Sequence, residues 1–165
     1  MGIKVGLIGA GSISFPHLLG YVKSQYVDEV VLCDQQEESA RRRQKEYRSL
    51  VKTITTDMES ILNDREVAVV DICVPPYLHH EIAIQAFQKG KDVIVEKPVA
   101  LDVEKADQMI AAAERFHKRL LVAHNQRFMP TNIRIKELLN NGEIGRPFLA
   151  QGCILGDELD RMNQE

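Results

Sequence analysis

The sequence predicts a doubly wound α/β fold with a parallel sheet, on two observations. Short runs of branched, apolar residues alternate with longer amphipathic segments along most of the chain. A glycine-rich turn, Gly9-Ala10-Gly11, directly follows the first of these runs. Strands joined by helices pair in parallel through right-handed crossovers. We therefore expect one doubly wound domain over most of the chain, followed by a further helix.

Five strands are expected, each rich in branched side chains and each followed by a glycine, a proline or a polar residue. They span residues 3–8, 29–33, 67–74, 92–95 and 120–123. A further strand is expected to begin within residues 148–155.

Helices are expected between these strands, from apolar spacings of three and four residues. The first carries Phe15, Leu18, Leu19 and Val22 on one side. The next spans residues 37–51, is heavily charged and is expected to be exposed. Residues 57–62 form a short helix with Ile61 and Leu62 turned inward, and residues 78–88 form one that Gly90 caps. The helix at 102–118 is expected to pack through an inner face formed by Ala106, Met109, Ile110 and Ala113. The last helix is expected to start at Pro130 and to end near Asn141-Gly142.

Composition excludes several other classes of protein. The chain has 165 residues, of which 44% are apolar and 27% charged, so a wholly disordered chain is excluded. A net charge of −3 argues against a dedicated nucleic-acid or membrane-surface binder. The sequence has neither a signal peptide nor an apolar run of membrane-spanning length, so a cytoplasmic protein is expected.

The three cysteines, Cys33, Cys73 and Cys153, are far apart in the sequence and form no CxxC pair or Cys/His cluster. We expect free thiols in packing roles, with no disulfide and no metal site.

The turn at Gly9 and Gly11 fits a Rossmann phosphate-binding turn, in which the first glycine permits a tight bend and the second a close approach to pyrophosphate. Ser14 stands where glycine or alanine is usual, and Pro16 follows it. The regular helix is therefore expected to begin between Ser12 and Ser14, with a hydroxyl as N-cap that also reaches a phosphate oxygen. The alternative is a tight turn that binds no ligand.

Asp34 ends the second expected strand and follows Ser14 by 20 residues, the spacing typical of an acid that binds the adenosine ribose. A carboxylate there favours NAD over NADP because it repels a 2′-phosphate. Its alternative role is to cap the following helix. Arg41, Arg42 and Arg43 suit a solvated helix face, although an arginine there can also neutralise a 2′-phosphate.

Polar residues follow three other strands, at residues 75–80, 96–98 and 124–128, where open α/β sheets bind their ligands. Lys97 precedes a proline that restricts it and that can adopt a cis bond, and a lysine held there can donate a hydrogen bond to a substrate oxygen. The alternative is an ordinary surface lysine. Of the five histidines, His79, His80 and His124 follow strands and are preferred as site residues over His17 and His117, which fall within helices.

These motifs together resemble the glucose–fructose oxidoreductase/inositol dehydrogenase (Gfo/Idh/MocA) family over about residues 3–150. The resemblance rests on the glycine turn, Asp34 and four further motifs. These are Pro75-Pro76-x-x-His79, Ala86-x-x-x-Gly90-Lys91-x-Val93, Glu96-Lys97-Pro98 and Asn125-x-Arg127-Phe128-x-Pro130. It implies an NAD(P)-dependent oxidoreductase that acts on a hydroxyl group of a sugar or polyol, with NAD the expected cofactor.

The resemblance also implies roles for individual residues. Lys97 would contact the reacting group of the substrate. The implied cofactor-binding residues are Gly9, Gly11, Ser12, Ile13, Asp34, Val74, Pro75, Pro76, His79, Glu96, Asn125 and Arg127. Within this set, Glu96 would lie near the nicotinamide ribose, and Asn125 and Arg127 beside the nicotinamide and the domain junction.

The resemblance implies a dinucleotide-binding domain at residues 1–125 and, at 126–165, a connecting helix and the start of an incomplete second α/β domain. Members of this family use that second domain to supply an Asp and a His for proton transfer, and homo-oligomers are expected to form through its sheet. No histidine follows His124 here, so that base has no counterpart, and we expect this chain to bind cofactor without efficient turnover. Two alternatives remain open: a non-catalytic domain that binds or senses NAD, and a related domain that binds no cofactor.

Overall fold

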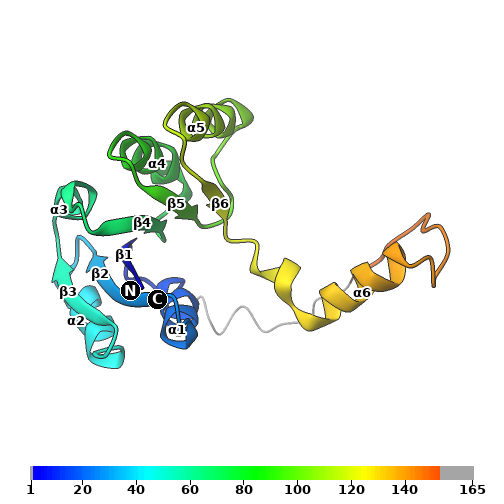
Figure 1. Ribbon diagram of the computed structural model, residues 1–165, viewed down its shortest axis with the longest axis horizontal. Coiled ribbons are helices and arrows are strands. Elements are labelled where there is room, and N and C mark those ends of the chain that lie inside the picture. Colours follow the sequence, from blue (N-terminus) through cyan, green and yellow to red (C-terminus); the bar gives the residue numbers. More distant parts are fainter. Residues whose placement is uncertain (1, 153–165) are drawn as a thin grey trace. The chain divides into compact units, whose positions relative to one another are not determined.

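Six parallel strands form one sheet in the computed structural model, which describes residues 2–152 (Figure 1). They are β1 (Ile3–Ile8), β2 (Val27–Cys33), β3 (Val51–Thr55), β4 (Val67–Ile72), β5 (Asp92–Val95) and β6 (Leu120–Val122). They lie in the order β3-β2-β1-β4-β5-β6, and every neighbouring pair is parallel. The predicted doubly wound fold is confirmed.

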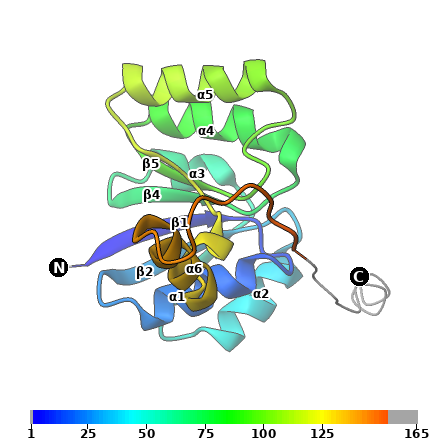
Figure 2. The same ribbon diagram turned by 90° about the vertical axis from the view of Figure 1, so that its right-hand side faces the viewer.

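Helices cover both faces of this sheet (Figure 2). One face packs against α1 (Ser14–Lys23) and α2 (Glu37–Glu46), and its core includes Leu7, Leu18 and Leu32. The other face packs against α3 (Met58–Asn63), α4 (His79–Gln88) and α5 (Val103–Arg115), around Phe87 and Met109. Two apolar layers therefore bury β1 and β4 from both sides.

The strand order reverses between β1 and β4, which lie side by side although β2 and β3 separate them in sequence. The connections that leave these two strands run to opposite faces of the sheet, which opens a crevice at their carboxyl ends. The glycine turn follows β1 and the segment at Val74 and Pro75 follows β4, so both lie at this crevice.

The structure corrects the expected helix at residues 37–51. α2 ends at Glu46, and β3 follows as an edge strand that pairs with β2. Its middle residues Lys52 and Thr53 are exposed, so the segment lacks the apolar run that marks the central strands. A polar edge strand of this kind also discourages pairing with other chains.

Helix packing agrees with expectation only in part. Ile61, Leu62, Met109 and Ala113 are buried as predicted. Of the four apolar side chains predicted to pack on α1 only Leu18 is buried, and four side chains expected on packed faces are exposed. These are Phe15, Leu19 and Val22 on α1 and Ile110 on α5.

Aspartate side chains cap the starts of two helices, and a glycine follows the end of a third. The Asp57 and Asp102 carboxylates accept hydrogen bonds from the Glu59 and Lys105 amides at the starts of α3 and α5. Gly90 follows α4 with φ of +76°, the left-handed conformation expected of a glycine there.

The described residues divide into two units, 2–124 and 125–152. The described elements of the second unit are η2 (Asn125–Phe128) and α6 (Pro130–Asn140), with Pro130 in the first turn as predicted. Residues 148–152 form no strand, contrary to expectation, and the remainder of the strand expected within 148–155 lies outside the described residues, as does Cys153.

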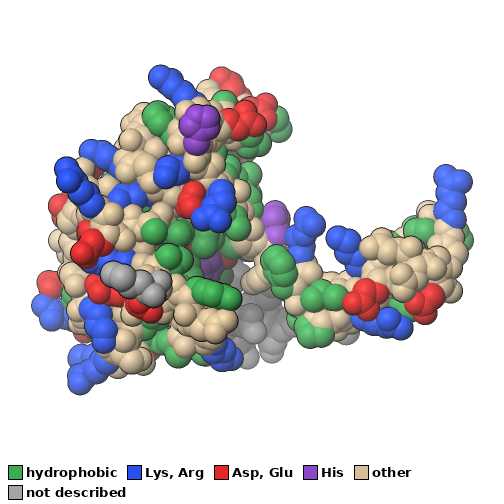
Figure 3. Space-filling model, in the orientation of Figure 1, with side chains coloured by type: hydrophobic (Ala, Val, Ile, Leu, Met, Phe, Trp, Pro, Cys, Tyr) green, Lys and Arg blue, Asp and Glu red, His purple; other side chains and the backbone are tan. Residues whose placement is uncertain are grey.

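None of the helices in the described part of the chain is both long and apolar enough to cross a bilayer. On the face drawn in Figure 3, acidic and basic side chains are intermingled, so that face offers no extended patch of one sign.

Candidate functional site

The turn after β1 requires glycine at its first position. Gly9 has φ of +103°, and a Cβ atom there would overlap the carbonyl of Cys73 at the end of β4. The Gly9 amide donates to the Cys33 carbonyl at 2.8 Å, and the Cys73 amide donates to Ile8 at 2.8 Å. The turn is thus fixed to the ends of both strands that flank β1.

The carbonyl of Gly11 anchors the second half of this turn. It accepts hydrogen bonds from the Ser14 amide at 3.2 Å, from the Ser14 hydroxyl at 2.7 Å and from the Arg43 guanidinium at 3.1 Å. Ser14 is fully buried. Its hydroxyl therefore stabilises the turn from inside and does not reach a phosphate.

α1 begins at Ser14, within the expected range, but its N-cap is Ile13, which makes no side-chain capping bond. The expectation of a hydroxyl cap at this helix is therefore wrong. Serine fits the third position of the fingerprint because a short inward-turned side chain can bond the turn's own carbonyl.

Asp34 lies at the end of β2 beside the turn. Its carboxylate accepts the Ala10 amide at 2.7 Å and, through the other oxygen, the Gln36 amide at 2.8 Å. A carboxylate has about four acceptor positions, so these two bonds leave acceptor capacity on both oxygens. Asp34 both orders the turn and lines the open crevice.

Arg43 behaves differently from its neighbours, which corrects the expected solvated face of α2. Arg41 is exposed and pairs with Glu37 at 2.5 Å. The Arg43 side chain is only 11% exposed, lies 5.8 Å over the Phe15 ring and pairs with Glu46 at 2.9 Å. Its guanidinium also donates to the Gly11 carbonyl, so Arg43 connects α2 to the glycine turn. No sequence motif indicated this role.

A cleft of about 590 Å³ opens at the carboxyl ends of β1, β2 and β4. That volume is in the range of small-molecule and cofactor sites. Of the residues expected to bind cofactor, the cleft lining contains Gly9, Gly11, Asp34, Val74 and Pro75. It also contains Gln35, Gln36, Tyr77 and Glu81, which the sequence did not single out.

Pro76 begins the short helix η1 (Pro76–Leu78), and His79, which follows, is fully buried. One ring nitrogen of His79 lies 2.8 Å from the Val74 carbonyl and the other 2.9 Å from the Pro98 carbonyl. The ring therefore ties the segment after β4 to the segment after β5 and does not line the cleft.

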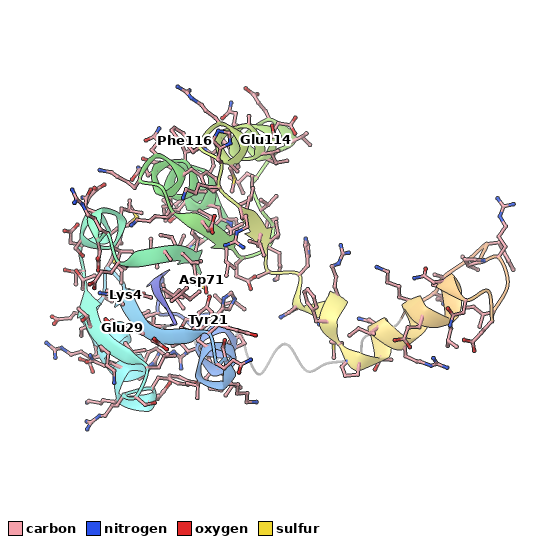
Figure 4. The ribbon with its side chains drawn as sticks, in the orientation of Figure 1. Lys4, Tyr21, Glu29, Asp71, Glu114 and Phe116 are labelled. Carbon is pink, nitrogen blue, oxygen red and sulfur yellow. The ribbon has the colours of Figure 1, made fainter. Side chains whose placement is uncertain are left out.

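A buried group of polar side chains lies between α1 and the ends of β4 and β5. His17 Nδ1 is 2.7 Å from Asp71 Oδ2, and His17 Nε2 is 3.1 Å from Glu96 Oε1. The Tyr21 hydroxyl donates to the same Asp71 oxygen at 2.6 Å, and the two side chains point toward one another in Figure 4. Asp71 is fully buried and Glu96 is nearly so.

Burial on its own lowers the pKa of His17, but the hydrogen bonds and negative charges of Asp71 and Glu96 outweigh it and raise the pKa to about 9. His17 is therefore an imidazolium ion at neutral pH. Burial and the Asp71 charge raise the pKa of the Tyr21 phenol, so Tyr21 stays a neutral donor. The sequence preference for His79, His80 and His124 over His17 missed this group.

Cys33 and Cys73 are buried free thiols, as expected. Burial raises the pKa of Cys33 to about 11, with further contributions from Asp34 and Asp57. The fold also brings ligand atoms of His17, Asp71 and Cys73 within 4.8 Å of one another. This Cys/His cluster could not be predicted from the sequence, because His17 is far from the other two residues along the chain. Because His17 and Tyr21 already donate to Asp71, hydrogen bonding accounts for this arrangement without a cation.

Lys97 is exposed and follows Glu96 directly. Its backbone amide donates to Glu96 Oε2 at 2.9 Å, and the Lys97–Pro98 peptide bond is cis. Asn125 and Arg127 lie in η2 of the second unit, where both are exposed.

The glycine turn, the acid at the end of β2 and the strand order define the class of nucleotide-binding Rossmann domains. Residues 3–124 match the Gfo/Idh/MocA model, described as an oxidoreductase family with an NAD-binding Rossmann fold. The chain belongs to this family, which confirms the resemblance seen in the sequence.

Several relatives of this chain are named as dehydrogenases. The chain is 32% identical to levoglucosan dehydrogenase from Pseudarthrobacter phenanthrenivorans over 163 residues, an alignment that covers 94% of this chain and 41% of the relative. It is 30% identical to inositol 2-dehydrogenase/D-chiro-inositol 3-dehydrogenase from Lactiplantibacillus plantarum, covering 88% of this chain and 42% of the relative. A solved structure of levoglucosan dehydrogenase in complex with NADH and L-sorbose matches with a TM-score of 0.80 at 32% identity, covering 88% of this chain and 40% of that chain. The chain thus spans less than half the length of these relatives.

Proposed function

We propose that the cleft binds NAD and that the protein transfers a hydride between the nicotinamide and a hydroxyl-bearing carbon of a sugar or polyol. The observation that carries the proposal is Asp34, which holds the glycine turn by one bond and still presents acceptor capacity to the cleft. Membership of an NAD-binding oxidoreductase family supports it, as do relatives named for levoglucosan and inositol.

The residues present fit a dinucleotide. Gly9 and Gly11 leave room for a pyrophosphate to approach the backbone at the start of α1. Asp34 would accept hydrogen bonds from the adenosine ribose hydroxyls, and Val74 and Pro75 would form the opposite wall. Pro76 and His79 would support that wall from behind.

NAD is proposed over NADP for two reasons. The Asp34 carboxylate would repel a 2′-phosphate. Arg43, whose guanidinium could offset that charge, is engaged by the Gly11 carbonyl and Glu46.

At the other end of the site, the bound nicotinamide supplies the hydride acceptor or donor. Lys97 is proposed to donate a hydrogen bond from its ammonium group to the substrate oxygen, which favours the charge that develops there. Glu96 is proposed to act behind it, near the nicotinamide ribose, and Ser12, Ile13, Asn125 and Arg127 remain proposed cofactor contacts.

The direct test is a fluorescence titration of the chain with NADH and with NADPH. Wild type should bind NADH more tightly, and Asp34→Asn should weaken NADH binding about tenfold, the effect of losing one charge-assisted hydrogen bond. Glu38→Gln removes the same charge from an exposed position on α2 and should leave the affinity unchanged. Tighter binding of NADPH to the wild type would contradict the assignment of Asp34.

A second candidate is a domain that binds or senses NAD without catalysing a reaction. It is favoured by the cleft lining in the described residues, which contains acids but no histidine to serve as a base. Substrate-dependent NADH formation in assays with NAD and inositol or levoglucosan would exclude the second candidate. Binding without efficient turnover is the result expected of this chain under both candidates, because the family's proton-transfer base has no counterpart in it.

A further inference from the structure

Glu96 joins two parts of the proposed site. One of its carboxylate oxygens faces His17 Nε2 at 3.1 Å on helix α1, and the other accepts the backbone amide of Lys97 at 2.9 Å. Helix α1 also begins at the glycine turn. A single buried side chain therefore links the segment that carries Lys97 to the helix that carries the turn.

The His17 ring is held by a carboxylate on each side. Nδ1 faces Asp71 and Nε2 faces Glu96, and a carboxylate accepts but does not donate hydrogen bonds. A neutral imidazole has only one N–H, so only the imidazolium ion makes both bonds. Tyr21 and Cys73 are the other titratable groups that face Asp71 in this cluster, and both remain neutral because their pKa values are raised by burial.

We propose that His17 is a positioning residue, whose imidazolium ion holds Glu96 and thereby fixes the backbone of Lys97 relative to the glycine turn. This inference rests on the proposed function, because the position of Lys97 matters only if that residue meets the substrate. Buried ion pairs add little net stability compared with apolar packing of the same volume. What this cluster supplies to the fold is a defined geometry across α1, β4 and β5.

The first test needs neither cofactor nor mutation. Carbon-detected NMR spectra report the Lys97 nitrogen through the preceding carbonyl carbon, so the signal survives at high pH. As pH rises from 6.5 to 10, the Lys97 nitrogen should shift with the same midpoint as the His17 ring. The Arg119 amide, which donates to the Asp92 carboxylate at 2.9 Å, is the matched control and should not follow that midpoint.

The second test uses His17→Gln, with Tyr21→Phe as control. The control removes a hydrogen bond to the same Asp71 oxygen but leaves the ring bonded to Glu96. In wild type and in the control, saturating NADH should shift the signals of both Gly11 and Lys97. In His17→Gln, Gly11 should still respond while the response of Lys97 is lost.

The outcomes separate this proposal from the proposed function. If NADH shifts no signal in wild type, the proposed function fails, and the pH titration alone then decides whether His17 holds the Lys97 backbone. If the Lys97 nitrogen ignores the titration of His17, or responds to NADH equally in wild type and His17→Gln, the positioning role is overturned. The wild-type titration also decides the question if His17→Gln does not fold.

Discussion

The strongest quantitative prediction concerns the stability of the fold against pH. The pKa of His17 is raised from an ordinary value of 6.5 to about 9, so the folded chain keeps a proton that the unfolded chain releases. The stabilisation is fully present below pH 6.5 and is lost as pH rises through about 9. At about 1.4 kcal/mol per pH unit, the full difference is about 3 kcal/mol. The ring keeps 12% of its surface exposed, and with allowance for solvent screening we expect a loss of about 2 kcal/mol.

Urea unfolding at intervals from pH 6.5 to 9 measures this loss directly. The upper limit matters because the ordinary thiol pKa is 9.0, and the buried Cys33 and Cys73 also destabilise the fold above it. The matched variant is His17→Gln, which should be less stable at pH 6.5 because it leaves Asp71 and Glu96 without their cation. Its free energy of unfolding should then vary little over the same interval.

Two results would contradict the assignment of His17 as a buried imidazolium ion. A wild-type free energy of unfolding that stays constant within about 0.5 kcal/mol from pH 6.5 to 9 would show that His17 is not held as an imidazolium ion. An equal loss in His17→Gln would show that another group causes the pH dependence.

Three further predictions concern the turn and the core. Gly9→Ala should destabilise the fold by about 2 kcal/mol or more and abolish NADH binding, because Gly9 has a positive φ and a Cβ atom there would overlap the Cys73 carbonyl. Chemical denaturation and NADH titration measure the two effects, and normal NADH binding would contradict the prediction. Arg43→Ala should weaken NADH binding severalfold, because the Gly11 carbonyl loses its bond to the guanidinium. Arg41→Ala, which changes an exposed arginine on the same helix, should leave the affinity for NADH unchanged, and equal affinities of the two variants would contradict this role of Arg43. Phe87→Ala should cost about 3–5 kcal/mol in urea unfolding, since this side chain is fully buried, and a loss below about 1 kcal/mol would mean that the core repacks around it.

The sequence was sufficient for the parallel sheet because its central strands are buried on both faces and therefore read as apolar runs. β3 was missed because an edge strand needs no such run: of its five residues only Val51 is fully buried. The helix before it was predicted to continue through residues 47–51 because no glycine or proline marks the end of α2.

The site was predictable where its chemistry is local. Gly9, Gly11 and Asp34 follow their strands directly, and turn geometry and spacing identify them. His17 could not be identified in this way, because its partners lie 54 and 79 residues further along the chain. One signal was present: Asp71 interrupts an apolar strand, and a buried acid needs a donor. Only the fold shows that His17 and Tyr21 are the partners of Asp71.

Helix α1 connects the glycine turn to the backbone of Lys97. At its first turn, the Gly11 carbonyl accepts hydrogen bonds from Ser14 and from Arg43 of α2, which fixes the backbone that is proposed to bind a pyrophosphate. Three residues after Ser14, the same helix presents His17 to Asp71 and Glu96. A displacement of helix α1 would therefore move the glycine turn and would also disturb the contact between His17 and Glu96. In the proposed function, NAD bound at the start of α1 would therefore be linked through His17 and Glu96 to the backbone of Lys97, the residue proposed to act on the substrate.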